Sequence, residues 1–130
     1  MNALITQYIV IVIPCQPGVV NILNISQKIP PDFVLINGCR ATVRYQWGPT
    51  IPNATYSLSF NNRVSNPIRE QADKSSMLSK EGCKYFKLLE PTQGGTYVQG
   101  YLESDGTAAF EDYTVVITLR GKKLINTTKK

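Results

Sequence analysis

Histidine is missing from the 130 residues, and cysteine is scarce. Without histidine the chain lacks the commonest general base and the commonest neutral metal ligand. The three cysteines, Cys15, Cys39 and Cys83, form no Cys-x-x-Cys pair and no zinc-type spacing. We interpret them as buried, reduced thiols of a protein made in a cytoplasm. The composition therefore predicts a protein that is not an enzyme, with no catalytic residue, no metal and no cofactor.

One group of acids surrounds a predicted hairpin loop in the segment ESDGTAAFED, at Glu103, Asp105, Glu111 and Asp112. The segment lacks the alternating acid spacing of a calcium-binding loop. Asp-Gly pairs are also favoured in turns for backbone reasons alone. We therefore interpret this segment as a solvated turn rather than a metal site.

The chain has no apolar run long enough to span a membrane as a helix. Its most apolar stretch lies within MNALITQYIVIVIPC, where Thr6, Gln7 and Tyr8 interrupt the run and no Lys or Arg precedes it. These features argue against a secretory leader. We expect a strand over residues 7–13 that is apolar on both faces. Such a strand must be covered twice, either within the domain or by a neighbouring subunit.

Charge is unevenly distributed, because the end of the chain has no acid. Residues 1–119 contain nine acidic and nine basic side chains, so the excess of five positive charges lies entirely beyond them. We expect one domain over residues 1–120 and a basic tail over residues 121–130. The basic residues that we expect to dock electrostatically are Arg120, Lys122, Lys123, Lys129 and Lys130. A protein partner is favoured over nucleic acid, since no aromatic residue is interleaved with them.

Turn residues recur every eight to twelve positions and helix signals are nearly absent, which is typical of a sandwich or barrel. Residues 41–47 and 54–60 alternate between apolar and polar side chains, as half-buried strands do. The expected strands cover residues 7–13, 19–25, 34–36, 41–47, 54–60, 84–89, 96–102 and 113–120. The sequence thus predicts an all-β antiparallel sandwich of about eight strands. That number favours a jelly roll over an immunoglobulin-like sandwich.

The apolar N-terminal strand is the second surface that we expect to bind a partner. Its residues are β-branched or aromatic, and a chain of this size has few elements to cover both faces. The residues chosen for apolar docking are Tyr8, Ile9, Val10, Ile11, Val12 and Ile13.

One hydrophobic strand carries a resemblance to a known family. After the Gly82-Cys83 turn the chain reads YFKLLEP, with the matching residues Tyr85, Phe86, Leu88, Leu89 and Pro91, and YSLSFNN lies upstream. This pattern resembles the small single-jelly-roll virion proteins of bacteriophages, of the penton (vertex) or head-decoration type. The resemblance implies a core strand here, and a structural protein assembled in the host cytoplasm into the virion. Its partners would be the major capsid protein, other virion proteins and further copies of itself.

Two other functions stay open. Cys39, Trp47 and GGTYVQG resemble a variable-type immunoglobulin domain, which would imply a secreted viral protein that binds a host receptor. The cysteine spacing departs from that pattern, since Gln99 stands where the second cysteine is expected. A tail or spike attachment component would have nearly the same sequence features as a capsid cement protein.

Overall fold

The computed structural model describes residues 2–44, 52–60, 68–74, 85–92 and 96–126, and every regular element in them is a β-strand. The strands are β1 (Asn2–Cys15), β2 (Val20–Lys28), β3 (Phe33–Arg44), β4 (Ala54–Phe60), β5 (Ile68–Gln71), β6 (Asp73–Lys74), β7 (Phe86–Pro91), β8 (Tyr97–Asp105) and β9 (Tyr113–Asn126). No helix in this described part of the chain is long and apolar enough to cross a membrane. The prediction of an all-β protein is confirmed.

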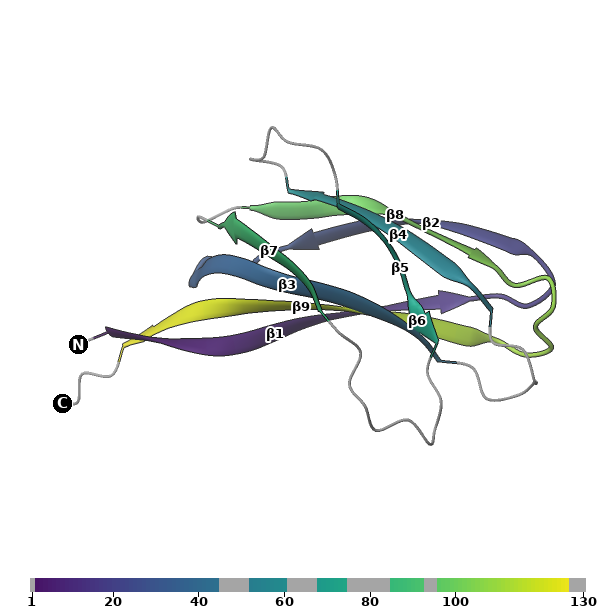
Figure 1. The fold of residues 1–130 in the computed structure, drawn as a ribbon, viewed down its shortest axis with the longest axis horizontal. Helices are drawn as coiled ribbons and strands as arrows, with labels where there is room; N and C mark the ends of the chain where they lie inside the picture. Colours follow the sequence, from purple (N-terminus) through teal and green to yellow (C-terminus); the bar gives the residue numbers. More distant parts are fainter. Residues whose placement is uncertain (1, 45–51, 61–67, 75–84, 93–95, 127–130) are drawn as a thin grey trace.

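The strands form two stacked sheets (Figure 1). The first sheet has the order β1-β9-β3, with β6 and β7 both pairing the outer edge of β3, and the second has the order β2-β8-β4-β5. All pairs are antiparallel except the two-residue pairing of β6 with β3. Leaving β6 aside, each sheet has four strands, and the chain crosses from one sheet to the other at every connection except β4 to β5, which is the connectivity of a jelly roll.

The position of the last two long strands separates this arrangement from an immunoglobulin-like sandwich. In an immunoglobulin domain the last two strands are neighbours in one sheet. Here β8 pairs with β2 and β4, whereas β9 pairs with β1 and β3 in the opposite sheet. The predicted antiparallel sandwich is therefore confirmed, and its strand order is that of the jelly roll.

The core lies between the sheets and is built by alternation along each strand. On β9 the predicted inward residues Val115, Ile117 and Leu119 are fully buried. On β4 the same holds for Tyr56 and Leu58, while Thr55 is exposed. Burial of these side chains is the main favourable contribution to folding.

Strand β3 differs from the expectation, because it runs unbroken from Phe33 to Arg44 where two shorter strands were predicted. The Asn37-Gly38 pair, which falls in the gap between the two expected strands, lies inside β3 at a bulge in its pairing with both β9 and β7. A bulge adds one residue and bends the strand without ending it. The turn-forming residues here therefore mark an irregularity within one strand.

Strand β9 also continues farther than expected, through Asn126 rather than ending at Arg120. Residues 121–126 pair with the start of β1, from Asn2 to Gln7, so they belong to the sheet and not to a tail. The last pairs lie beyond Phe33, where β3 begins, and Figure 1 shows both termini at this projecting end. Lys129 and Lys130 lie outside the described residues.

Strand β7 was expected to be a core strand, and this is corrected by its position at the edge of the first sheet. Leu88 packs against the core, whereas Phe86 and Pro91 are exposed and Leu89 is 71% exposed. An apolar run alone does not distinguish a strand paired on one side from one paired on both sides. Tyr85, which precedes the strand, lies on its outer side.

A buried polar cluster joins the sheets near the β1–β2 turn. The hydroxyl oxygens of Tyr113 and Ser104 lie 2.6 Å apart, and the side-chain amide of Asn21 donates to the Tyr113 oxygen at 3.3 Å. Asn21 also accepts from the backbone N–H of Gln16 at 2.9 Å. Hydrogen bonding of this kind offsets the cost of burying polar groups.

Replacing Tyr113 by Phe should lower the free energy of unfolding by about 1–2 kcal/mol, because Ser104 and Asn21 lose a buried partner. Urea unfolding followed by circular dichroism measures this change. Tyr101→Phe is the matched control, since the Tyr101 ring lies on the outer side of β8 and is 37% exposed. Equal midpoints for the two variants would contradict a stabilising role for the cluster.

Candidate interaction surface

The outward side of the first sheet, which we call the outer face, begins with β1. Along this strand Ile9, Ile11 and Ile13 turn towards the core, and the even-numbered residues turn outward. Four outward residues form what we call the apolar row, and they are 50–59% exposed: Leu4, Tyr8, Val10 and Val12. The expectation that the whole segment Tyr8–Ile13 would dock thus holds only for its outward half.

An aromatic and basic cluster lies next to the apolar row. The guanidinium carbons of Arg40 and Arg120 lie 4.7 Å and 4.5 Å from the centre of the Tyr85 ring. The Tyr8 ring lies 6.4 Å from the Tyr85 ring, centre to centre. Cation–π contacts at such distances contribute about 0.5–1 kcal/mol each at an exposed site. The cluster therefore holds three strands and the residue before β7 in one arrangement.

Arg120 is fixed by β3 as well as by the ring. Its Nε donates to the Asn37 side-chain oxygen at 2.9 Å, and its terminal nitrogen donates to the Asn37 carbonyl at 3.2 Å. The guanidinium lies over Gly38, where a Cβ would come within 2.9 Å of it. The absence of a side chain at Gly38 is therefore what allows Arg120 to lie flat on the sheet.

The two lysines that follow lie on different sides of β9. Lys122 turns outward and donates to the Thr6 hydroxyl at 2.9 Å. Lys123 forms an ion pair with Asp32 at 3.4 Å, which is exposed and contributes little to stability. Arg120 and Lys122 are thus brought to the outer face beside Tyr8 and Thr6, as their strand pairing requires. Lys123 is balanced by an acid elsewhere.

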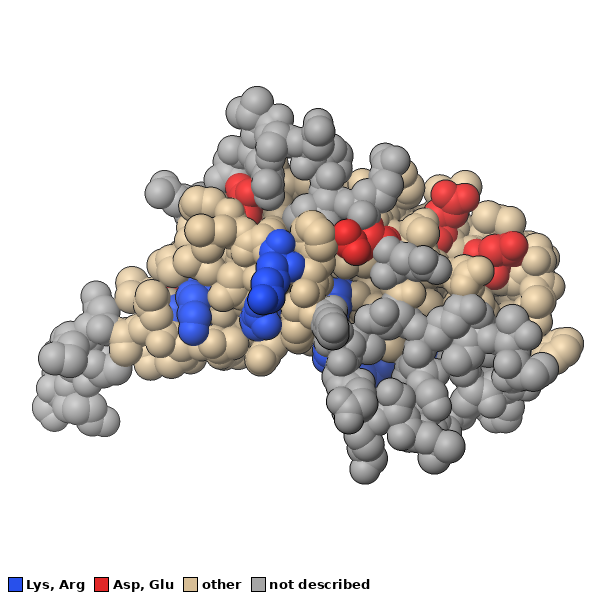
Figure 2. Space-filling model, viewed as in Figure 1, with Lys and Arg blue, Asp and Glu red and all other residues tan. Residues whose placement is uncertain are grey.

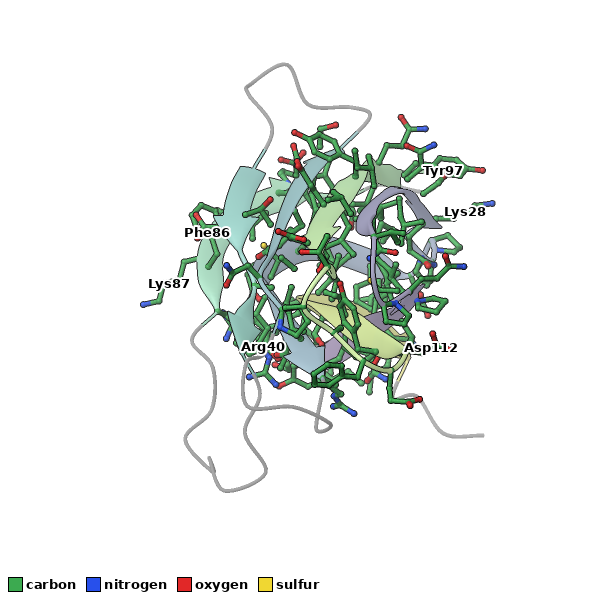
Figure 3. All side chains as sticks on the ribbon, turned by 90° about the vertical axis from the view of Figure 1, so that its right-hand side faces the viewer. Lys28, Arg40, Phe86, Lys87, Tyr97 and Asp112 are labelled. Carbon is green, nitrogen blue, oxygen red and sulfur yellow. The ribbon has the colours of Figure 1, made fainter. Side chains whose placement is uncertain are left out.

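Apart from the Lys123–Asp32 pair and the buried Glu90 of β7, basic and acidic side chains lie over different parts of the molecule (Figure 2). Figure 2 shows Lys and Arg gathered over the sheet that contains β3 and β9, with the Asp and Glu atoms lying higher in that view. Glu103 and Asp105 belong to β8 in the second sheet. Figure 3 shows Phe86 and Lys87 on one side of the sandwich and Lys28 and Tyr97 on the other. The outer face is therefore a mixed apolar and basic surface.

The predicted acidic turn and the thiols have structural explanations. The Asp105 carboxylate accepts from the Thr107 hydroxyl at 2.7 Å and from its N–H at 3.0 Å, and these bonds lower the pKa of Asp105. Within the described ranges no three His, Cys, Asp or Glu side chains gather as a metal site would require. Cys15 and Cys39 are buried free thiols, and burial raises the pKa of both, while Cys83 lies outside the described residues.

Arg40 and Leu4 are members of the surface that the sequence interpretation missed, and Tyr85 was assigned to a core strand instead. Arg40 precedes the alternating segment by one residue, so continuing the alternation backwards would have placed it outward with Thr42. Tyr85 carried no such signal, because an aromatic residue at the start of an apolar strand is equally typical of a core. Its position follows from the pairing of β7 with β3, a contact between residues distant in sequence.

Comparison with known family models, with curated proteins and with solved structures gives no match to this chain.

Proposed function

We propose that this protein is a structural component of a virion, a capsid cement, decoration or vertex protein that binds the major capsid protein and stabilises the shell. The observation that carries the proposal is an eight-stranded jelly-roll order with an uncovered apolar and basic outer face. Jelly rolls are frequent in viral capsids, although the fold also serves other functions, so the fold supports the proposal by analogy. The resemblance of YFKLLEP to small virion proteins points the same way.

The outer face has the composition that binding to a protein shell requires. The apolar row would supply the buried centre of the contact, and Arg40, Arg120 and Lys122 its charged margin. A stable contact buries about 800 Å² on each partner. Exposed apolar side chains gathered on one strand are the kind of patch that marks such a site.

The same surface is less suited to nucleic acid. Single-stranded nucleic acid is bound by aromatic rings on which the bases stack. The Tyr85 ring already has two guanidinium groups within 5 Å of its centre, so its π-system is engaged inside the protein. An acidic patch on a protein partner would instead meet the outward edges of those guanidinium groups.

The experiment that tests the function uses an antibody raised against the purified chain. Particles are isolated on a density gradient from a culture that carries the gene, and the fractions are probed with the antibody. We expect the protein to sediment with the particle peak and to label its surface in immunogold electron microscopy. Recovery of all the protein at the top of the gradient would contradict a structural role in the virion.

The role of the outer face is tested by charge reversal. Arg40→Glu should weaken attachment to the particle at least about tenfold, and the loss should be larger at low salt, because exposed charges are screened as salt rises. The matched control is Lys28→Glu, which makes the same charge change on β2 in the second sheet, away from Arg40 (Figure 3). Equal binding by the two variants would show that attachment does not use the outer face. Deletion from residue 121 is unsuitable, since those residues pair with β1.

A further inference from the structure

Strand β1 has a long edge that pairs with no other strand of the described residues. It pairs with β9 over all 14 residues without a bulge, and it is the end strand of its sheet. Its outward-pointing N–H and C=O groups therefore form a continuous row, along a strand roughly 45 Å long. Such an edge is a template for pairing with another strand, and proteins normally protect it.

The protections used elsewhere in this fold are absent from β1. Natural edge strands are blocked by charged residues, above all Lys, by Pro, or by bulges. The other edge strands among the described residues each contain at least one charge: Lys28 in β2, Arg69 and Glu70 in β5, Asp73 and Lys74 in β6, and Lys87 and Glu90 in β7. Strand β1 contains no charged residue, and its one proline, Pro14, is the penultimate residue.

The side of the sandwich next to this edge is also apolar. A groove of about 330 Å³ runs between β1 and β2, lined by Ile11, Val12, Ile13, Pro14, Leu23, Asn24, Ile25 and Ser26. Ile22, on the outward side of β2, is 68% exposed. The free edge therefore continues into an apolar groove and then into a second exposed aliphatic side chain.

We propose that the β1 edge is the contact between two copies of this chain, which pair antiparallel about a two-fold axis and extend the first sheet across both molecules. A second copy fits because an uncharged strand meets no like charge in any antiparallel register. Registers that set even-numbered residues opposite even-numbered ones continue the apolar row from one copy to the next. They also allow Tyr8 to lie opposite a valine, an aromatic and β-branched pair that stabilises sheets.

The geometry also covers the groove. In a two-fold pair with a continuous sheet, both second sheets lie on the same side, so the β1–β2 grooves of the two copies face each other. The side that each copy contributes is roughly 45 Å long and roughly 15–20 Å deep, which gives on the order of 800 Å² per partner. That area matches what a stable dimer requires. The inference goes beyond the proposed virion role and does not depend on it.

The test is sedimentation equilibrium of the full chain at protein concentrations from about 1 to 200 μM. We expect a species of twice the 14.5 kDa chain mass. Val12→Lys should shift the equilibrium towards monomer by at least about tenfold. Val116→Lys is the matched control, since Val116 is the cross-strand neighbour of Val12 on the same face but is paired on both sides. A monomeric wild type at all concentrations, or equal loss of dimer in both variants, would overturn the proposal.

Amide hydrogen exchange of the wild-type chain is a second test of edge pairing, and it needs no variant. Alternate N–H groups of β1 that point away from β9 should exchange slowly at high protein concentration and at least about tenfold faster at low concentration. Exchange at these positions that is fast at every concentration would exclude edge pairing. Neither measurement involves the virus particle. A failure of the dimer proposal would therefore leave the particle-gradient test of the virion role unaffected.

Discussion

Replacing Gly100 by Ala should prevent the chain from folding. Gly100 lies in the middle of β8, opposite Leu58 of β4 and Ile25 of β2. A Cβ built on it would lie far inside contact distance of the Ser57 carbonyl oxygen, which is a backbone atom that cannot turn away. The two strands would have to separate in the middle of the second sheet. We expect a loss of more than about 4 kcal/mol, which is most of the stability of a small domain.

The matched control is Gly38→Ala, which adds the same methyl group to another strand glycine. There the three atoms nearest to the Cβ would all belong to the Arg120 guanidinium, the mobile end of a flexible side chain. Gly38→Ala should therefore fold, with a loss of about 1 kcal/mol as Arg120 moves away from Asn37. Thermal unfolding followed by circular dichroism compares the two proteins. A Gly100→Ala protein as stable as Gly38→Ala would show that β4 and β8 are not held this closely together.

These two glycines also show what could be predicted from sequence. Alternation identified β4 and the buried row of β9, because a strand with one buried face shows alternating apolar and polar residues within its own short sequence. The close approach at Gly100 and the guanidinium over Gly38 depend on the neighbouring strand. Such pairings join residues far apart in the chain, and no local pattern records them. For this reason β3 was predicted as two strands, over residues 34–36 and 41–47, and β7 was placed in the core.

For the candidate surface, individual residues could likewise be predicted from the sequence, but not which of them lie together. Tyr8 and Arg120 were both expected to bind partners, but as parts of two separate segments. The register of β1 against β9 places them opposite each other, so the two expected sites become one. Tyr85 joins them from a third segment. The chemistry of each residue was evident from its type, whereas their convergence followed only from strand order.

Strand β1 offers two separate binding surfaces, its outward side chains and its backbone edge. Its outward side chains form the apolar row of the outer face, and its backbone edge points sideways towards the groove. A partner lying on the outer face would contact side chains, whereas a second copy would contact the backbone. Both contacts can therefore be occupied at once, and a dimer would present two apolar rows to one shell.

The second large effect is expected at alkaline pH, where Cys39 should make the fold less stable. Burial raises the pKa of the Cys39 thiol from 9.0 to about 11; the contact with the Tyr56 hydroxyl, 3.6 Å away, opposes this shift and the charge of Glu70 adds to it. Below pH 9 the thiol is protonated in both states and its contribution is fully present. Between pH 9 and pH 11 the unfolded chain releases this proton and the folded chain retains it. The free energy of unfolding should therefore fall by about 2 kcal/mol over this range.

Cys39→Ala separates this effect from the titration of other groups. Burial also raises the pKa of Cys15 and of Tyr113, so some alkaline loss should remain in the variant. Urea unfolding from pH 7 to pH 11 should give a smaller slope above pH 9 for Cys39→Ala than for the wild type, even though the variant starts from a lower stability at pH 7. Parallel curves for the two proteins would mean that Cys39 ionises as readily in the folded chain as in the unfolded one. Such a result would be incompatible with a thiol enclosed between the sheets beside Tyr56, because a thiolate there would be shielded from water.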